Sequence, residues 1–206
     1  MLLYDNPMSS NALKVRFLLA ELGLEYDRRE VPISQPRPDW YLAENPLGGI
    51  PALQDGDLVL AESNAILRYL AQREGRADLY PAAPAQRAPV DEFLDRFATA
   101  FRGAFFQVER LALGFVQGRG FEQGPPDPEG ARAKEAEVAA TVELFERVVA
   151  DNGTVVGSFT IADCAAAPVL FRTRNSGMDL TPYPKLLRLR ETVTARDGFA
   201  AAGAVL

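Results

Sequence analysis

The chain has 206 residues, of which 48% are hydrophobic and 24% charged, an ordinary globular composition with enough apolar material for a packed core. This length favours one or two domains. The formal net charge of −6 argues against nucleic acid or an anionic membrane as a partner, because basic surfaces bind phosphate groups.

Histidine and cysteine usage narrows the chemistry further. The chain has no histidine, which removes the usual general base and the commonest zinc ligand, so we expect neither a Ser-His-Asp triad nor a metal. The single Cys164 cannot form an internal disulfide, which agrees with a reducing compartment. The first residues show neither a signal peptide nor a membrane span, so the expected location is cytoplasmic.

The first eighty residues alternate short apolar runs with helical patterns. We expect parallel strands at 2–4 and 25–31, with helices at 11–22 and 40–43. Residues 52–54 and 58–60 flank an Asp-Gly pair that favours a tight antiparallel hairpin. Ser63 is a candidate N-cap for a helix that turns Ile66, Tyr69 and Leu70 inward.

Beyond a proline-marked linker at 81–87 the pattern becomes helical. Apolar residues at helical spacing predict two long helices, the first with Phe93, Phe97, Phe101, Phe105 and Val108, the second with Val138, Val142, Phe145 and Val149. The glycine- and proline-rich residues 114–129 are the expected loop between them. One further strand-like run lies at 154–156.

Two motifs carry more information than periodicity does. Thr160 and Asp163 have the spacing of a capping box, which marks a helix start and by itself indicates fold only. Pro51 opens a predicted strand; a cis Ile50-Pro51 bond would leave the Ile50 amide and carbonyl free to pair with an extended peptide. Ser63 and the amides after it suit a carboxylate.

With these motifs the chain resembles the cytosolic glutathione transferase family over nearly its full length. The resemblance rests on residues 9–16, Asn45-Pro46 to Leu53, Glu62-Ser63, and Gly157 with 160–163. The paired serines and the segment 179–184 are similar to zeta-class members, which include maleylacetoacetate isomerases. The family fold is an α/β thioredoxin-like N-terminal domain followed by an all-α C-terminal domain, which implies domains at 1–80 and 88–206.

The resemblance also implies site residues. Ser9 takes the catalytic hydroxyl position, with Ser10 as the second candidate. The segment Ile50-Pro51 would hold the cysteinyl backbone of glutathione, and Glu62 with Ser63 its γ-glutamyl end. Glutathione would be a co-substrate, and family members usually form homodimers.

Physical chemistry gives Ser9 a reason to be there. A thiol of pKa ~8.5 is only a few per cent thiolate at neutral pH. Lowering that pKa by ~2 units requires about 2.7 kcal/mol. A hydroxyl hydrogen bond to the anion supplies roughly 1.5–3 kcal/mol and a helix start about 0.3–2 kcal/mol. The alternative interpretation is that both serines only cap the helix.

Phe101, Phe105 and Phe106, with Arg102 and Arg110 nearby, are candidates for a second, apolar substrate site, although such a stripe also suits plain core. The expected function is a glutathione transferase that attacks a small hydrophobic electrophile. Two alternatives remain open: a binding or regulatory module that keeps the fold without turnover, and a glutathione-dependent cis-trans isomerase.

Overall fold

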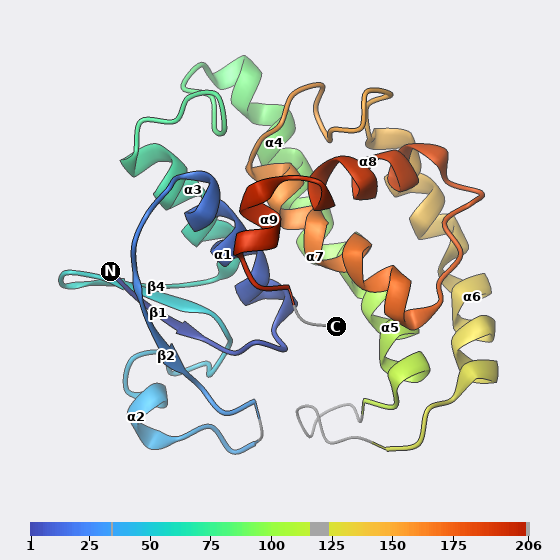
Figure 1. The fold of residues 1–206 in the computed structure, drawn as a ribbon, viewed down its shortest axis with the longest axis horizontal. Helices are drawn as coiled ribbons and strands as arrows, with labels where there is room; N and C mark the ends of the chain where they lie inside the picture. Colours follow the sequence, from blue (N-terminus) through green and yellow to red (C-terminus); the bar gives the residue numbers. More distant parts are fainter. Residues whose placement is uncertain (34, 116–123, 205–206) are drawn as a thin grey trace.

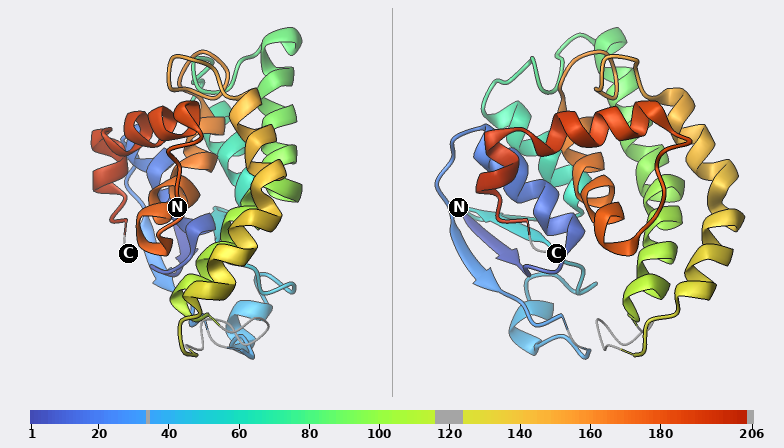
Figure 2. Two further views of the ribbon diagram at one scale, coloured as in Figure 1. Left: turned by 90° about the vertical axis from the view of Figure 1, so that its right-hand side faces the viewer. Right: turned by 45° about the vertical axis from the view of Figure 1, so that its right-hand side comes forward.

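The computed structural model describes residues 1–33, 35–115 and 124–204. A small sheet flanked by helices lies beside a larger group of helices, and the C-terminal segment crosses back over the first helix (Figure 1). The same arrangement is seen from two other directions in Figure 2. The predicted fold class, an α/β domain with an all-helical domain, is confirmed.

The sheet has four strands in the order β2-β1-β3-β4, comprising Leu2–Asp5 (β1), Asp27–Glu30 (β2), Ala52–Asp55 (β3) and Leu58–Ala61 (β4). β1 pairs in parallel with β2 and antiparallel with β3, and β3 pairs antiparallel with β4. The parallel pair needs a crossover, which helix α1 (Ser10–Glu21) provides. The hairpin turns at Gly56, whose φ of 60° suits glycine.

Alternation along the strands gives the sheet two different faces. Leu3 and Leu53 join the main core with α1 and α3 (Ser63–Arg73). Tyr4 and Ala52 point the other way and form a small separate cluster with Tyr41 of α2 (Asp39–Leu42). The helices α1 and α3 therefore occupy the face that meets the helical domain.

The helical domain is built from long helices around a buried one. Its elements are α4 (Pro84–Arg96), the π-helical turn η1 (Phe97–Phe101), α5 (Arg102–Leu113), α6 (Pro128–Val148), α7 (Ile161–Ser176), α8 (Pro184–Thr194) and α9 (Asp197–Ala201). α7 packs against α1, α4, α5 and α8. α4 begins inside the residues expected as a linker, and the division into domains stays a prediction.

The expected capping box is present. Thr160 accepts from the amide of Ala162, and the Asp163 carboxylate accepts from the backbone amide of Thr160 at 2.8 Å. Asp163 also accepts from the amide of Val155 at 2.8 Å, which ties the preceding loop to the helix start. The box is fully buried, where water could not replace it.

Two expectations about local structure are wrong. Residues 154–156 form bends, with their chain direction set by contacts to Asn152 and Asp163. The first long helix runs without a gap from α4 to α5 but is not one uniform α-helix, because the π-helical turn η1 lies within it. A run of phenylalanines spaced four apart drifts around an α-helix, and a turn with i→i+5 bonds takes up the extra residue. Of the expected loop 114–129, residues 116–123 lie outside the described residues, and residues 128–129 already belong to α6.

No helix in the described part of the chain is both long and apolar enough to cross a membrane.

Candidate functional site

Ser9 stands at the start of α1, directly after the turn that leaves β1. It is the N-cap: its Oγ accepts from the amide of Ala12 at 3.2 Å. The same hydroxyl donates to the carbonyl of Ile50 at 3.2 Å. One side chain thus joins the helix start to the segment before β3. Ser9 therefore caps the helix, and its hydroxyl proton is directed at the segment expected to hold a ligand.

Ile50 precedes a cis Pro51, as the sequence predicted. The expectation that the Ile50 carbonyl is free is wrong, because Ser9 donates to it. The Ile50 amide makes no hydrogen bond within the described residues, so it is available to an extended ligand. Just before it, the Gly49 carbonyl accepts from the hydroxyl of Tyr41 and from the side-chain amide of Asn45, which fixes the approach to the strand.

Glu62 has a φ of 70°, the one positive φ at a non-glycine residue in the described chain. Such a conformation costs of order 1–3 kcal/mol and concentrates at functional sites. The expectation that Ser63 is the N-cap of α3 is wrong, because Glu62 is the N-cap residue and Ser63 is the first helical residue. No side chain caps this helix start, and the exposed Glu62 carboxylate makes no hydrogen bond or ion pair within the described residues, although its charge acts on Lys14. Amides and a carboxylate are therefore both open here.

Ser10 is buried in the first turn of α1 and contacts the helical domain. Its Oγ lies 3.4 Å from Nη2 of Arg102, the first residue of α5. The guanidinium of Arg102 also lies 5.4 Å from the centre of the Phe106 ring. Burial lowers the pKa of Arg102, and the neighbouring Arg172 acts in the same direction. This corner joins the two domains through a serine and a cation.

Phe101 and Phe105 point away from this corner. Phe101 stacks on Phe145 with ring centres 4.8 Å apart, and Phe105 packs edge-on against the same ring at 5.9 Å. Both side chains are almost fully buried between α5 and α6. The alternative interpretation of the stripe as core fits these contacts, and Phe106 is the aromatic residue beside Arg102.

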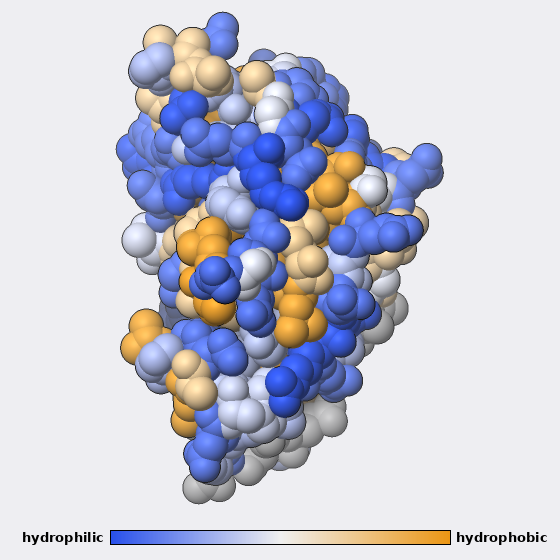
Figure 3. Space-filling view, turned by 90° about the vertical axis from the view of Figure 1, so that its left-hand side faces the viewer, coloured by the Kyte–Doolittle hydropathy of each residue, from blue (hydrophilic) through white to orange (hydrophobic). Residues whose placement is uncertain are grey.

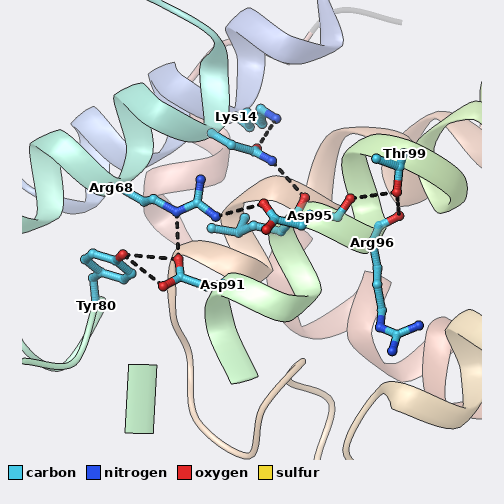
Figure 4. A network of polar contacts seen from close by, with 9 residues as sticks. Lys14, Arg68, Tyr80, Asp91, Asp95, Arg96 and Thr99 are labelled. Atoms are coloured by element: carbon cyan, nitrogen blue, oxygen red, sulfur yellow. Dashed lines mark hydrogen bonds and ion pairs between the residues drawn. The ribbon is translucent and has the colours of Figure 1, made fainter. Parts of the chain in front are cut away.

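The sequence analysis missed Lys14, which lies one turn beyond Ser10 on α1. Its amino group is buried and donates to Oδ1 of Asn64 at 2.6 Å, while Asn64 donates to the carbonyl of Leu94 at 2.9 Å (Figure 4). Burial lowers the pKa of Lys14 to about 7, with the positive charge of Arg102 adding to the effect. In the sequence, the sign of this position was its spacing of four residues from Ser10, which places the two side chains on the same face of the helix.

A second network beside it holds α3 against α4. Arg68 forms ion pairs with Asp91 at 2.7 Å and Asp95 at 3.1 Å, and the Tyr80 hydroxyl donates to Asp91 (Figure 4). Because Asn64 and Arg68 lie one turn apart on α3, both networks fix the helix that carries Ser63 at its start.

The turn before Ser9 is anchored from the helical domain as well. Arg172 of α7 donates to the carbonyl of Met8 at 2.6 Å and pairs with the buried Glu109 of α5 at 3.2 Å. Burial raises the pKa of Glu109, against the lowering effect of Arg172 and Arg102. A buried pair of this kind is strongly destabilising to break and fixes the position of the groups that it holds.

Neither a hollow beside α4 nor a metal-binding cluster adds a group to the candidate site in the described chain. A hollow of about 240 Å³ between α4 and the end of α6 is lined by Pro89, Phe93, Val148 and their neighbours, and by none of the candidate site residues. Within the described residues, no cluster of three or more metal-binding side chains is found.

A mixed four-stranded sheet with a serine-capped first helix, a cis-proline strand and an open helix start after β4 defines a thioredoxin-like ligand-binding domain joined to a helical domain. Comparison with known proteins identifies the family. Residues 1–72 match the family described as "Glutathione S-transferase, N-terminal domain", and residues 128–192 match "Glutathione S-transferase, C-terminal domain". The chain belongs to the glutathione S-transferase family.

Individual relatives cover most of the chain. It is 32% identical to glutathione S-transferase GstB of Escherichia coli over 94% of this chain and 93% of the relative, and 35% identical to glutathione S-transferase 3 of Zea mays over 96% and 90%. A theta-class glutathione S-transferase from Xanthomonas axonopodis pv. citri, solved with glutathione bound, superposes with a TM-score of 0.83 at 26% identity, covering 100% of this chain and 97% of that one. The expected enzyme class and the co-substrate, glutathione, are confirmed.

Proposed function

We propose that this chain activates the thiol of glutathione through the hydroxyl of Ser9, for attack on a small electrophile with an apolar body. The observation that carries the proposal is the position of the Ser9 hydroxyl, at the start of α1 and 3.2 Å from the carbonyl of Ile50. A cysteinyl residue paired as an added strand with Ile50 would place its sulfur beside that hydroxyl.

The two contacts of Ser9 are compatible with catalysis. Its cap contact uses an oxygen lone pair, which accepts from the Ala12 amide, so the single hydroxyl proton remains to be donated. That proton now points to the Ile50 carbonyl and can turn to a thiolate by rotation about one torsion. A charged acceptor forms the stronger hydrogen bond, so the thiolate wins this competition.

The remaining residues would bind the peptide ends. The γ-glutamyl end of glutathione carries an ammonium and a carboxylate. Glu62 is exposed and unpaired among the described residues, which suits the ammonium, and the uncapped start of α3 at Ser63 suits the carboxylate.

The test compares Ser9→Ala with Ser9→Thr, which keeps both hydroxyl and cap. Ser9→Ala should raise the pKa of the bound thiol, followed by ultraviolet absorbance of the thiolate, and lower kcat roughly tenfold to a hundredfold at neutral pH. Glutathione affinity measured by calorimetry should hardly change. Loss of the cap should also cost about 1 kcal/mol of stability, so each variant is checked by urea unfolding.

Two further variants separate the roles. Ser10→Ala should have a smaller effect on the thiol pKa, and Glu62→Ala should weaken glutathione binding without shifting that pKa. An unchanged thiol pKa in Ser9→Ala would remove Ser9 from the catalytic role, and a shift confined to Ser10→Ala would give the role to its neighbour. Glutathione binding without turnover on any electrophile would instead favour a binding module.

We also propose that two copies of the chain form a homodimer, as the resemblance to the family implies. Exposed leucines on the sheet domain, Leu47 and Leu58, supply apolar surface for such a contact.

A further inference from the structure

Within the described residues, Arg102 at the junction of the two domains makes no ion pair with a carboxylate. Its only hydrogen bond within the described residues is the 3.4 Å contact from Nη2 to Ser10, and its Nε is fully enclosed with no partner at all. Buried charges are normally paired, and an enclosed donor without a partner carries a desolvation penalty. The described part of the chain therefore provides no anion to pair with this guanidinium.

The nearby carboxylates do not fill this position. Glu109, the acidic group that acts most strongly on Arg102, is hydrogen-bonded to Arg172 at 3.2 Å. The amino group of Lys14 adds a further basic group whose charge interacts with that of Arg102. Glu62 is the opposing charge felt by Lys14, and its proposed partner is the ammonium group of glutathione. In a chain of net charge −6, this corner is locally basic.

The position of Arg102 suggests which anion it meets. Ile50, Glu62 and Ser63, which would hold glutathione, all belong to the sheet domain, whereas Arg102 comes from α5 of the helical domain. It follows directly on the π-helical turn η1, a feature that often accompanies functional sites. Phe106, one turn further along α5, places an aromatic ring next to the guanidinium. A cation beside an aromatic surface suits an aromatic or apolar molecule that bears a carboxylate.

We propose that the preferred electrophile of this enzyme carries a carboxylate, which Arg102 binds while the apolar part of the molecule lies against Phe106. The inference rests on the proposed function and specifies its substrate class. Arg102 contacts the substrate away from the reacting carbon, so its contribution is specificity.

A matched pair of probes tests this, 4-chloro-3,5-dinitrobenzoate and the neutral 4-chloro-3,5-dinitrobenzamide. In both, the glutathione thiolate attacks the carbon that bears chlorine, the C–S bond forms, and chloride leaves with the electron pair of the C–Cl bond. The thiol proton has already passed to solvent, and the carboxylate or amide is unchanged. Intrinsic reactivity differs between the probes, so each is compared between wild type and variant.

Arg102→Gln should lower kcat/KM for the benzoate by roughly tenfold to a hundredfold and leave that for the benzamide within about twofold. Arg102→Lys should restore part of the benzoate activity because it keeps the charge. Arg147→Gln is the matched control: it removes an arginine that is exposed on α6 and paired with Glu143, and it should change neither value. Glutathione affinity by calorimetry should be the same in all four proteins.

A measurement on wild type alone covers the case in which the variants do not fold. The unreactive 3,5-dinitrobenzoate should inhibit competitively against the electrophile at least tenfold better than 3,5-dinitrobenzamide, and added salt should reduce this difference.

Several outcomes would overturn the inference. Equal losses on both probes, with a raised pKa of the bound thiol, would show that Arg102 acts on the thiolate. Weaker glutathione binding in Arg102→Gln would assign it to a carboxylate of glutathione. If wild type turns over the benzamide and Arg102→Gln leaves the benzoate activity unchanged, the proposed substrate class is wrong and the proposed function stands. If wild type is inactive on both probes, the substrate class and the proposed function are both wrong.

Discussion

Lys14 places an amino group in the interior beside Asn64, and this makes the stability of the protein pH-dependent. The pKa of Lys14 falls from 10.5 to about 7 on folding, mainly because of burial. Between these two values the unfolded chain binds a proton that the folded chain does not. The free energy of unfolding therefore rises as the pH increases from about 7 toward 10.5, with a slope of up to ~1.4 kcal/mol per pH unit.

Lys14→Met should remove this rise. We expect wild type to gain unfolding free energy between pH 7 and pH 9 relative to the variant, measured by urea denaturation. Lys134→Met, which changes a lysine on the surface helix α6, is the control and should leave the dependence as in wild type. Parallel pH curves for wild type and Lys14→Met would contradict the assignment.

At the same scale, Ser9 shows how one side chain can cap a helix and still keep a hydroxyl proton to donate. Its oxygen accepts from the helix and its proton is left for another partner. The sequence could suggest both roles, because serine suits each of them. Only the folded chain shows that the proton meets the carbonyl of Ile50, a residue far away in the sequence.

Among the elements, α7 depends on its buried first turn. Both oxygens of Asp163 accept backbone amides, from Val155 and from Thr160. Asp163→Asn turns one oxygen into a donor that faces an N–H group, so we expect a loss of about 2–4 kcal/mol in the free energy of unfolding. Asp127, the exposed cap of α6, offers a matched control.

Because asparagine also caps helices well and water reaches the start of α6, Asp127→Asn should cost no more than about 0.5 kcal/mol. Both variants are compared by urea unfolding at the same pH. Equal small losses at the two helix starts would contradict the structural role of the box.

The element that sequence periodicity misjudged is the helix through Phe93, Phe97 and Phe101. Spacing alone indicated one helix, and it gave no sign of the π-helical turn η1. The reason lies in packing, since Phe93, Phe97 and Phe101 all contact the ring of Phe145 on α6. A uniform α-helix would rotate successive members of this series away from that ring.

For the whole molecule we predict association into a dimer. Sedimentation at micromolar concentration should give a species near twice the chain mass of 22.5 kDa. The side of the molecule in Figure 3 carries apolar groups in separate areas of a mostly hydrophilic surface. Leu58, 41% exposed on the edge strand β4, is a candidate contact residue, so Leu58→Asp should shift the protein toward the single-chain mass.

Leu144→Asp changes a leucine of similar exposure on α6 and should leave the dimer intact. A single species near 22.5 kDa in wild type would contradict the proposal. If neither substitution changes the mass, the contact lies elsewhere. If both lower it, the contact is not specific to Leu58.

The sequence by itself indicated the family fold through motifs spread along most of the chain. It also determined the start of α1 at the paired serines and the capping box of α7, because each depends on residues close together in the chain, and it favoured a cis Pro51. Tertiary structure decided which side chains meet: Ser9 with Ile50, Ser10 with Arg102, Lys14 with Asn64. These pairs are 41, 92 and 50 residues apart. Local propensity and periodicity carry no information about such distances, since they depend on how the sheet, α1 and the helical domain pack together.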